Sequence, residues 1–394
     1  MRIGLRVLLP LLALSCSVPA RDGADTESAE EAREVERLPD LGLAGAPVVS
    51  SEAPAATGFS VELVPELILG EATGASFGTP VLRLAVDSRG VIYVGDWMNA
   101  CVWAFDPGGV SLGCIGGRGQ GPGEFQAVHS VEVGRGDSLF VFDANSRRLS
   151  AFATAPAPVL AYTLRIPTDT GHPFRLFVPT VWDDGFLFAF GQTGAGTIQL
   201  HRVDGRGEVD ARPILVGQDS ERVERVEPGS VVRTSPLFAR RPLLGLTPAN
   251  ELFYGWSESI DLTFFDLDGR WKSVFRGVSE RIPVTAADIQ HELGGVSEVT
   301  RRLLRDAQHH STKPALKSVV VDDNGWIWLE RFTADPGVSE WWVETREASV
   351  PSARFSLPDH VRVQIIRDGR AYAVSEDSDG YPTVVRFRVE VRRS

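Results

Sequence analysis

The chain has 394 residues, of which 43% are hydrophobic and 23% are charged. This balance excludes a wholly disordered chain and a protein that crosses a membrane many times. The formal net charge of −12 argues against a nucleic-acid partner held by a basic surface. Three cysteines are too few for a disulfide-rich scaffold, whereas 39 glycines and 25 prolines suit a protein of many short strands and turns.

The first residues predict an export signal. Arg2 and Arg6 make a short positive region, and residues 7–14 form an apolar run that is too short to span a bilayer. The run ends in LALSC, and small residues before a single cysteine resemble the lipobox of bacterial lipoproteins, in which Cys16 becomes the lipidated first residue. We therefore expect residues 1–15 to be a signal peptide and the protein to be anchored by lipid to the bacterial cell envelope, on the periplasmic or outer-membrane side. The alternative is an ordinary signal peptide with a chance cysteine.

The next segment predicts a tether. Residues 17–40 are rich in Glu, Asp, Arg and Ala and carry almost no large apolar side chain. Such a stretch cannot bury enough surface to offset its ordering entropy. We therefore expect a disordered acidic tether over residues 16–57, followed by one folded domain over residues 58–394.

The domain begins with an internal repeat. Residues 84–96 and 131–143 each contain an apolar strand, a polar turn with glycine and a second apolar strand. Each continues to a third strand that ends in Ala-Phe, at Phe105 and Phe152. The offset, 152 − 105 = 47 residues, is the length of a four-stranded propeller blade.

Weaker copies of the same pattern follow, and six turns mark six units. The last unit has room for only three strands before Ser394, and residues 59–69 form a strand-like stretch before the first full unit. We expect this N-terminal strand to complete the sixth blade, because closure covers an exposed sheet edge. The turn landmarks are Gly90, Gly136, Gly185, Asn250, Gly325 and Gly369.

Two long intervals between landmarks predict insertions. The charged residues 204–231 suggest a long loop or an extended hairpin. Residues 285–312, between blades four and five, predict a helical pair that packs over the propeller rim. Thr285 with Asp288 resembles a capping box, and Ser297 begins a second helix. In that second helix, apolar side chains share one side at Val299, Leu303 and Ala307.

The spacing of the first two units resembles the NHL repeat. In the first unit Asp96, Asn99, Val102 and Phe105 occupy the repeat positions, and the glycine-rich loop at 117–125 is similar to the loop between blades in bacterial six-bladed propeller lipoproteins. The second unit is complementary, with Asp143, Arg148, Leu149 and Phe152. The resemblance implies an all-β fold, a six-bladed β-propeller, and an exported location. It implies no particular activity.

Two cysteines predict a cross-strand disulfide. If the hairpin is symmetric about Pro107 and Gly108, then Cys101 and Cys114 face each other directly. An exported protein meets an oxidising compartment, which favours the bond. The alternative is two buried free thiols, and thiol counting in the denatured, oxidised protein separates the two cases.

Histidines are the only metal candidates. His129, His172 and His360 lie just before or at the first strand of a unit, so the three could converge at one mouth of the channel and hold zinc. The alternative is three isolated polar residues at the rim. Lactonase-type propellers use acidic residues around calcium, but no motif here selects such a set, and no catalytic residue is predicted.

The preferred function is therefore a membrane-tethered binding or scaffold module without a cofactor. Trp97 and Met98 follow a strand and could present an exposed apolar surface to an envelope protein, a peptide or a glycan. The alternatives are a metal-dependent lyase or lactonase-type enzyme, with zinc or calcium in the central channel, and a purely structural envelope protein. We expect a monomer that does not bind nucleic acid. Of the adjacent Trp341 and Trp342, only one is expected to face the core, and the other either packs under the rim or is exposed.

Overall fold

The computed structural model describes residues 59–78, 82–166, 174–182, 185–192, 196–227, 230–294, 296–307, 309–344 and 353–393. The chain divides into two units, Met1–Arg37 and Leu38–Ser394. The first unit lies wholly outside the described residues, as do Cys16, His172, the expected signal peptide and the expected tether. No helix among the described residues is both long enough and apolar enough to cross a membrane.

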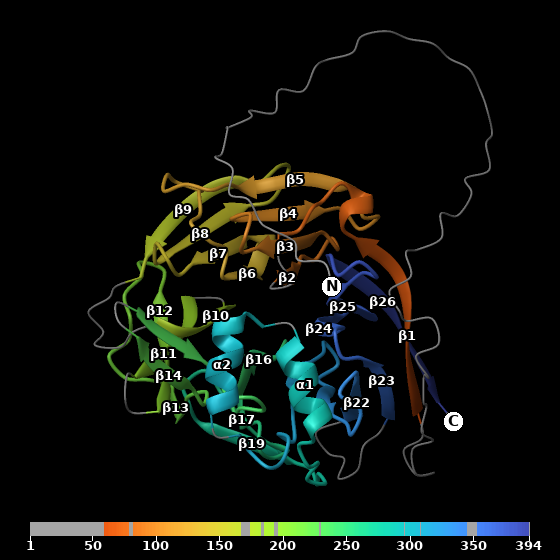
Figure 1. The fold of residues 1–394 in the computed structure, drawn as a ribbon. Helices are drawn as coiled ribbons and strands as arrows, with labels where there is room; N and C mark the ends of the chain where they lie inside the picture. Colours follow the sequence, from red (N-terminus) through yellow and green to blue (C-terminus); the bar gives the residue numbers. More distant parts are fainter. Residues whose placement is uncertain are drawn as a thin grey trace, which may run out of the picture. The chain divides into compact units, whose positions relative to one another are not determined.

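The second unit is a ring of six four-stranded antiparallel sheets (Figure 1), so the expected six-bladed propeller is confirmed. The first three blades are consecutive in the chain. Blade 1 consists of β2 (Leu82–Val86), β3 (Ile92–Asp96), β4 (Cys101–Phe105) and β5 (Ser111–Gly116). Blade 2 consists of β6 (Ser130–Val133), β7 (Leu139–Asp143), β8 (Arg148–Ala153) and β9 (Val159–Arg165). Blade 3 consists of β10 (Phe174–Trp182), β11 (Gly185–Gln192), β12 (Thr197–Asp204) and β13 (Leu215–Gln218).

The remaining blades contain the two insertions and the chain closure. Blade 4 consists of β16 (Pro242–Leu246), β17 (Leu252–Trp256), β18 (Asp261–Phe265) and β19 (Trp271–Arg276). Blade 5 consists of β20 (Ser318–Val321), β21 (Ile327–Phe332), β22 (Val338–Glu344) and β23 (Ala353–Pro358). Blade 6 consists of β24 (Arg362–Arg367), β25 (Arg370–Glu376), β26 (Pro382–Arg393) and β1 (Phe59–Leu69). Short 3-10 turns occur at Glu71–Thr73 and Arg135–Asp137.

The first strand of each blade lies innermost, around the axis of the ring. Each inner strand contacts the next, in the order β2, β6, β10, β16, β20, β24 and back to β2. The turns that leave these strands meet on one face of the ring, which we call the turn face. There the backbone N–H of Ser88 donates to Asp137 at 2.8 Å, and that of Asp368 donates to Asp323 at 2.8 Å.

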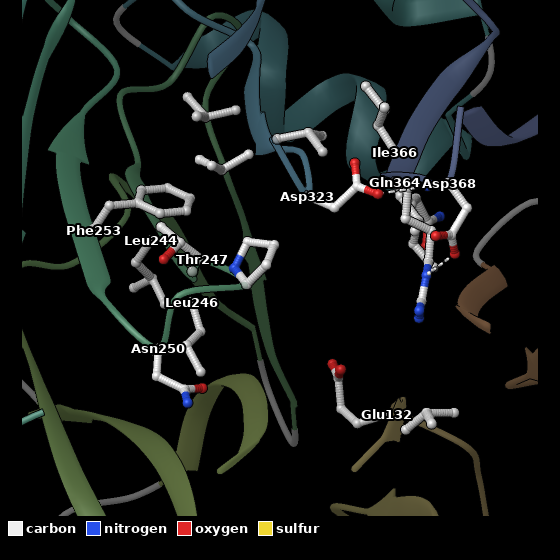
Figure 2. Close-up of a pocket in the computed structure, with 18 residues that line it drawn as sticks. Glu132, Leu244, Leu246, Thr247, Asn250, Phe253, Asp323, Gln364, Ile366 and Asp368 are labelled. Atoms are coloured by element: carbon white, nitrogen blue, oxygen red, sulfur yellow. Dashed lines mark hydrogen bonds and ion pairs between the residues drawn. The ribbon is translucent and has the colours of Figure 1, made fainter. Parts of the chain in front are cut away.

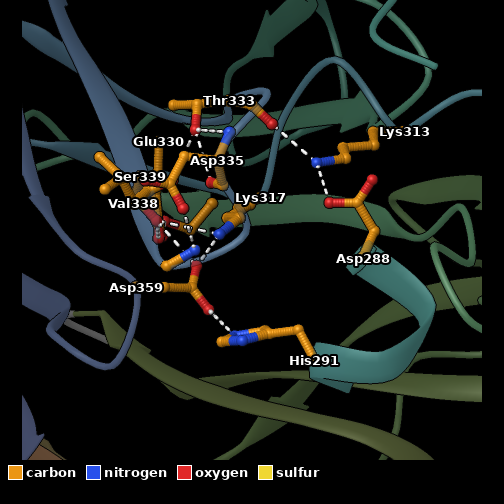
Figure 3. Close-up of polar contacts among 12 residues, drawn as sticks. Asp288, His291, Lys313, Lys317, Glu330, Thr333, Asp335, Val338, Ser339 and Asp359 are labelled. Carbon is orange, nitrogen blue, oxygen red and sulfur yellow. Dashed lines mark hydrogen bonds and ion pairs between the residues drawn. The ribbon is translucent and has the colours of Figure 1, made fainter. Parts of the chain in front are cut away.

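The opposite face, where the inner strands begin, carries the helical insertion, and we call it the helix face. Helices α1 (Ala286–Gly294) and α2 (Glu298–Asp306) lie between blades 4 and 5 in the chain, as expected. His291 of α1 lies 3.7 Å from Asp359, which precedes β24, and Figure 3 shows this contact. Lys313, which precedes β20, donates to Asp288 of α1 at 2.6 Å. These contacts hold α1 against the start of blades 5 and 6.

Local signals in the helical insertion are confirmed, with one exception. The N–H of Thr285 donates to Asp288 and the N–H of Asp288 donates to Thr285, which is the expected capping box. Ser297 caps α2 by accepting from the N–H of Thr300. However, Val299 is 57% exposed, and the buried face of α2 is formed by Leu303, as expected, together with Leu304.

The charged insertion contains a separate two-stranded hairpin. Strands β14 (Val223–Glu227) and β15 (Ser230–Thr234) pair with each other and with no blade. The expected insertion at 204–231 is therefore only partly correct, because β13 within that range is the outer strand of blade 3.

Blade packing corrects the expectation for the adjacent tryptophans. Trp341 is fully buried and stacks on Phe355, whereas Trp342 points to the other side of the sheet and is also buried. The guanidinium of Arg331 lies 3.8 Å from the ring centroid of Trp342. Both tryptophans are buried because each face of a blade packs against a neighbouring blade, so alternation along the strand does not separate core from solvent here.

Candidate functional site: the central channel

The centre of the ring contains two adjoining cavities. The larger, of about 540 Å³, is lined by the inner strands β6, β16, β20 and β24 and by the turns that follow β16, β20 and β24. The smaller, of about 370 Å³, follows β2 and β6 along their length and also touches β24. Because both cavities are lined by Glu132, Val133, Gln364, Ile365 and Arg367, we treat them as one site, the central channel.

Much of the channel wall is apolar. Figure 2 shows Leu244, Leu246 and Phe253 on one side of the larger cavity, with Ile366 across from them. Pockets that bind small molecules are concave and mostly apolar, with a few polar groups that orient the ligand. The channel is concave but more polar than this, because Glu132, Gln364, Arg367 and two aspartates also line it.

Blade 6 covers the polar edge of β2. Gln364 accepts from the N–H of Leu84 at 3.1 Å and donates to the carbonyl of Leu82 at 3.0 Å. Arg367 donates to the carbonyl of Val86 at 2.8 Å. These side chains replace the neighbouring strand that an inner strand lacks, so three backbone groups of β2 are satisfied without water. They also join the first and last blades at the point where the ring closes.

Glu132 stands apart from the other acids of the site. It lies on β6 between Val131 and Val133, and its carboxylate points into the larger cavity (Figure 2). Opposite it in the sheet is Phe140. Among the residues that the structure describes, it has no hydrogen-bond or ion-pair partner, and burial raises its pKa to about 8. Glu132 is therefore protonated at neutral pH and can donate a hydrogen bond into the cavity.

The two ends of the channel differ in charge. Toward the helix face, Arg83 lines the smaller cavity, and burial together with the nearby charge of Arg362 lowers the pKa of Arg83. Toward the turn face, Asp323 and Asp368 line the larger cavity. Arg367 donates to Asp368 at 3.1 Å, so part of this acidic end is neutralised.

The structure describes only two of the three histidines that were proposed to hold zinc. His129 is half-buried beside the start of β6, and its Nδ1 lies 3.1 Å from the N–H of Ala144. Burial lowers the pKa of His129, and the charge of Arg83 lowers it further. His360 precedes β24, whereas His172 is not described. Among the described residues, no three His, Cys, Asp or Glu side chains form a group that could hold a metal ion.

The loop residues Trp97 and Met98 lie on the helix face. They are 42% and 50% exposed, respectively. Asp96 orders their turn, because its carboxylate accepts from the N–H groups of Met98 and Asn99 at 3.1 Å each. Asp143 does the same in blade 2, where it accepts from the N–H of Asn145 at 2.9 Å. The repeat aspartates therefore organise the loops that follow β3 and β7.

The cysteine pair is joined in the structure, but not in the predicted register. The Cα atoms of Cys101 and Cys114 are 6.0 Å apart and a disulfide connects the residues, within the range usual for such bonds. In the ladder, however, Cys101 pairs with Gly116, and Cys114 pairs with Trp103. The symmetric hairpin is wrong because the turn holds three residues between Asp106 and Val110, and a bulge near Leu112 in β5 shifts the register by one more residue. Formation of the bond in the cell remains a prediction.

Sequence reasoning did not select Arg83 or Glu132. The available signal was a charged residue inside each of the inner strands β2 and β6, in the segments Leu-Arg-Leu and Val-Glu-Val. Such alternation is ordinary for a strand with one wet face. Only the ring reveals that this side of both strands lines the central channel.

Comparisons with known proteins agree on the fold. A sequence profile of DUF5128, described as a 6-bladed beta-propeller, matches residues 80–154, which cover blade 1 and most of blade 2. No curated protein gives a significant match.

Solved structures match over the whole propeller. A member of the DUF4221 family from Bacteroides vulgatus is 12% identical, with a TM-score of 0.51 over 85% of this chain and 99% of that chain. A Bacteroides fragilis protein whose export has been suggested is 10% identical, with a TM-score of 0.50 over 87% of this chain and 98% of that chain. A virginiamycin B lyase from Staphylococcus aureus is 8% identical, with a TM-score of 0.40 over 84% and 99% of the two chains. At such low identities, the first two matches show the fold alone.

Proposed function

We propose that this protein is an exported, lipid-anchored β-propeller that binds a ligand in its central channel. The observation that carries the proposal is the pair of adjoining cavities, about 540 and 370 Å³, whose partly apolar walls include Glu132, a carboxyl without a partner among the described residues. Their size suits a small molecule or a short peptide segment. A partner that docks on Trp97 and Met98 is the second candidate, because these neighbouring apolar side chains are exposed on the helix face.

A ligand screen with two kinds of variant tests the site. Thermal-shift measurements on the purified protein would use panels of organic acids, amines, sugars and short peptides. Val133→Trp and Leu246→Trp fill the channel, since both side chains line it and are only half-buried. We expect at least one class of ligand to raise the melting temperature of the wild-type protein, and this effect to be lost in the filled variants.

Other outcomes of the screen favour the alternatives. A stabilising ligand that is lost only in a Trp97→Ala, Met98→Ala variant would place binding on the helix face. About one zinc or calcium ion per chain, removed by chelation together with stability, would favour the lyase or lactonase-type enzyme. In that case His129, His172 and His360 would be substituted singly.

Lipid anchoring by Cys16 is part of the proposal and has its own test. Cells that express the full chain would be labelled with an alkyne analogue of palmitate. We expect the wild-type protein to carry the label in the membrane fraction, and Cys16→Ser to carry none, because the acyl chains require the cysteine sulfur and the new amino terminus. Equal labelling of both proteins would contradict a lipoprotein signal at residues 1–15.

A further inference from the structure

The helix-face end of the channel carries the positive charge of Arg83. Arg83 is exposed to the smaller cavity, and its one hydrogen bond is to the carbonyl of Leu82 at 3.1 Å. Within the described part of the chain, no carboxylate pairs with Arg83, and the charged group that acts on its pKa is Arg362. Because the guanidinium of Arg83 lies beside the smaller cavity without a carboxylate partner among the described residues, an anion in the cavity would be stabilised there.

A hydrogen-bond donor lies farther along the same cavity. Glu132 is on the neighbouring inner strand, and both Arg83 and Glu132 line the smaller cavity. Because the carboxyl of Glu132 is protonated at neutral pH, it does not repel an anionic ligand. Its O–H is available to a carbonyl or hydroxyl oxygen. Beyond it, the larger cavity offers the apolar surface of Leu244 and Leu246.

We propose that the channel binds an organic acid in a fixed orientation. Its carboxylate pairs with Arg83, an oxygen farther along the molecule accepts a hydrogen bond from Glu132, and its apolar end lies against β16. This inference rests on the proposed function and names the chemical class of its ligand. The orientation follows from the charge of the two ends, because the acidic end at Asp323 and Asp368 disfavours a second anion there.

Three matched compounds probe the three parts of the proposal. Benzoylpropionate has a carboxylate, a ketone and an apolar ring; phenylbutyrate lacks the ketone, and butyrophenone lacks the carboxylate. Binding to the purified full chain would be measured by ligand-observed NMR and calorimetry. We expect benzoylpropionate to bind about tenfold more tightly than phenylbutyrate or butyrophenone. Each of these two lacks one group that would form a charge-assisted or buried hydrogen bond, and one such bond contributes about this much.

Variants assign the two polar groups. Arg83→Gln should weaken binding of benzoylpropionate and phenylbutyrate about tenfold and leave butyrophenone unchanged, whereas Arg83→Lys should stay within about threefold of wild type. Glu132→Leu should bring benzoylpropionate to the affinity of phenylbutyrate. Glu132→Gln keeps a donor and should preserve the preference for the ketone. Unfolding midpoints in urea would establish that each variant is folded.

The pH dependence gives a second readout. As the pH rises from 7 to 9 through the pKa of about 8, Glu132 loses the proton that it donates. Affinity for benzoylpropionate should therefore fall about tenfold over this range. Arg83 keeps its charge there. The other charged groups that line the channel are Asp323, Arg367 and Asp368. Glu132→Gln retains these groups and should show a nearly flat profile.

The outcomes separate this inference from the proposed function. Equal binding of all three compounds, or no effect of Arg83→Gln, would overturn the acid-binding orientation. If Val133→Trp nevertheless abolished binding of these compounds, the proposal that the channel binds a ligand would still hold. The inference would also be overturned if none of the three compounds bound while another class of ligand stabilised the protein in the screen. The proposed function would stand in that case. Benzoylpropionate binding that survives both Val133→Trp and Leu246→Trp would overturn the channel site itself.

Discussion

A chain that begins at Gly70, and so lacks β1, should fail to unfold cooperatively and should aggregate. β1 pairs with β26 along its whole length and supplies the fourth strand of blade 6. Val61 and Ile68 pack in the core shared with blade 5, whereas Leu69 packs in the core shared with blade 1. Full burial of each such side chain contributes about 1.5–3 kcal/mol. Their sum is comparable to the about 5–15 kcal/mol that stabilises a typical domain.

The matched control begins at Gly58 and removes only residues that precede β1. We expect this chain to give one cooperative transition in urea and to elute as a monomer. The shorter chain would expose the edge of β26, which favours association between chains. If both chains had the same urea midpoint, ring closure by β1 would contribute little to stability, and the interpretation of blade 6 as a closed unit would be wrong.

Lys313→Met should destabilise the protein by about 3–5 kcal/mol, because it leaves a buried carboxylate without its cation. Nζ of Lys313 donates to Asp288 at 2.6 Å and to the carbonyl of Thr333 at 2.7 Å (Figure 3). The side chains of Lys313 and Asp288 are only 2% and 1% exposed. Burial raises the pKa of Asp288, but the hydrogen bonds from Lys313 and Thr285 outweigh it, so the pKa lies below its ordinary value.

Two further variants test this explanation by urea unfolding. The double variant Lys313→Met, Asp288→Asn removes both charges and should recover part of the lost stability. Arg270→Ala removes an exposed pair with Asp268 and should cost less than about 1 kcal/mol. A Lys313→Met variant within about 1 kcal/mol of wild type would contradict a structural role for the buried pair.

Local chemistry explains which predictions from the sequence are confirmed. The capping box of Thr285 and Asp288 joins residues three positions apart, so its hydrogen bonds depend on short-range geometry alone. The turn that Asp96 organises is equally local. The six blades and the closing strand followed from the period of the repeat and from the missing strand at the C-terminal end, because an open sheet edge needs a partner.

Predictions that depended on register or on packing between blades are less accurate. The three-residue turn and the bulge in β5 together shift Cys114 opposite Trp103, and no local signal distinguishes such a hairpin from a symmetric one of similar length. Trp341 and Trp342 are both buried because neighbouring blades cover both faces of the sheet. Alternation along a single strand predicts one buried and one exposed face, so it gives the wrong burial for side chains in a propeller blade.

By itself, the sequence determined the number of blades, the ring closure and the position of the helical insertion, since each follows from periodicity or from contacts between near neighbours. The tertiary structure alone decided where the chemistry lies. Arg83, Glu132 and Leu244 come from three different blades and meet only because the inner strands surround one axis. The raised pKa of Glu132 has the same origin, since the carboxyl is desolvated by strands that are distant in the chain.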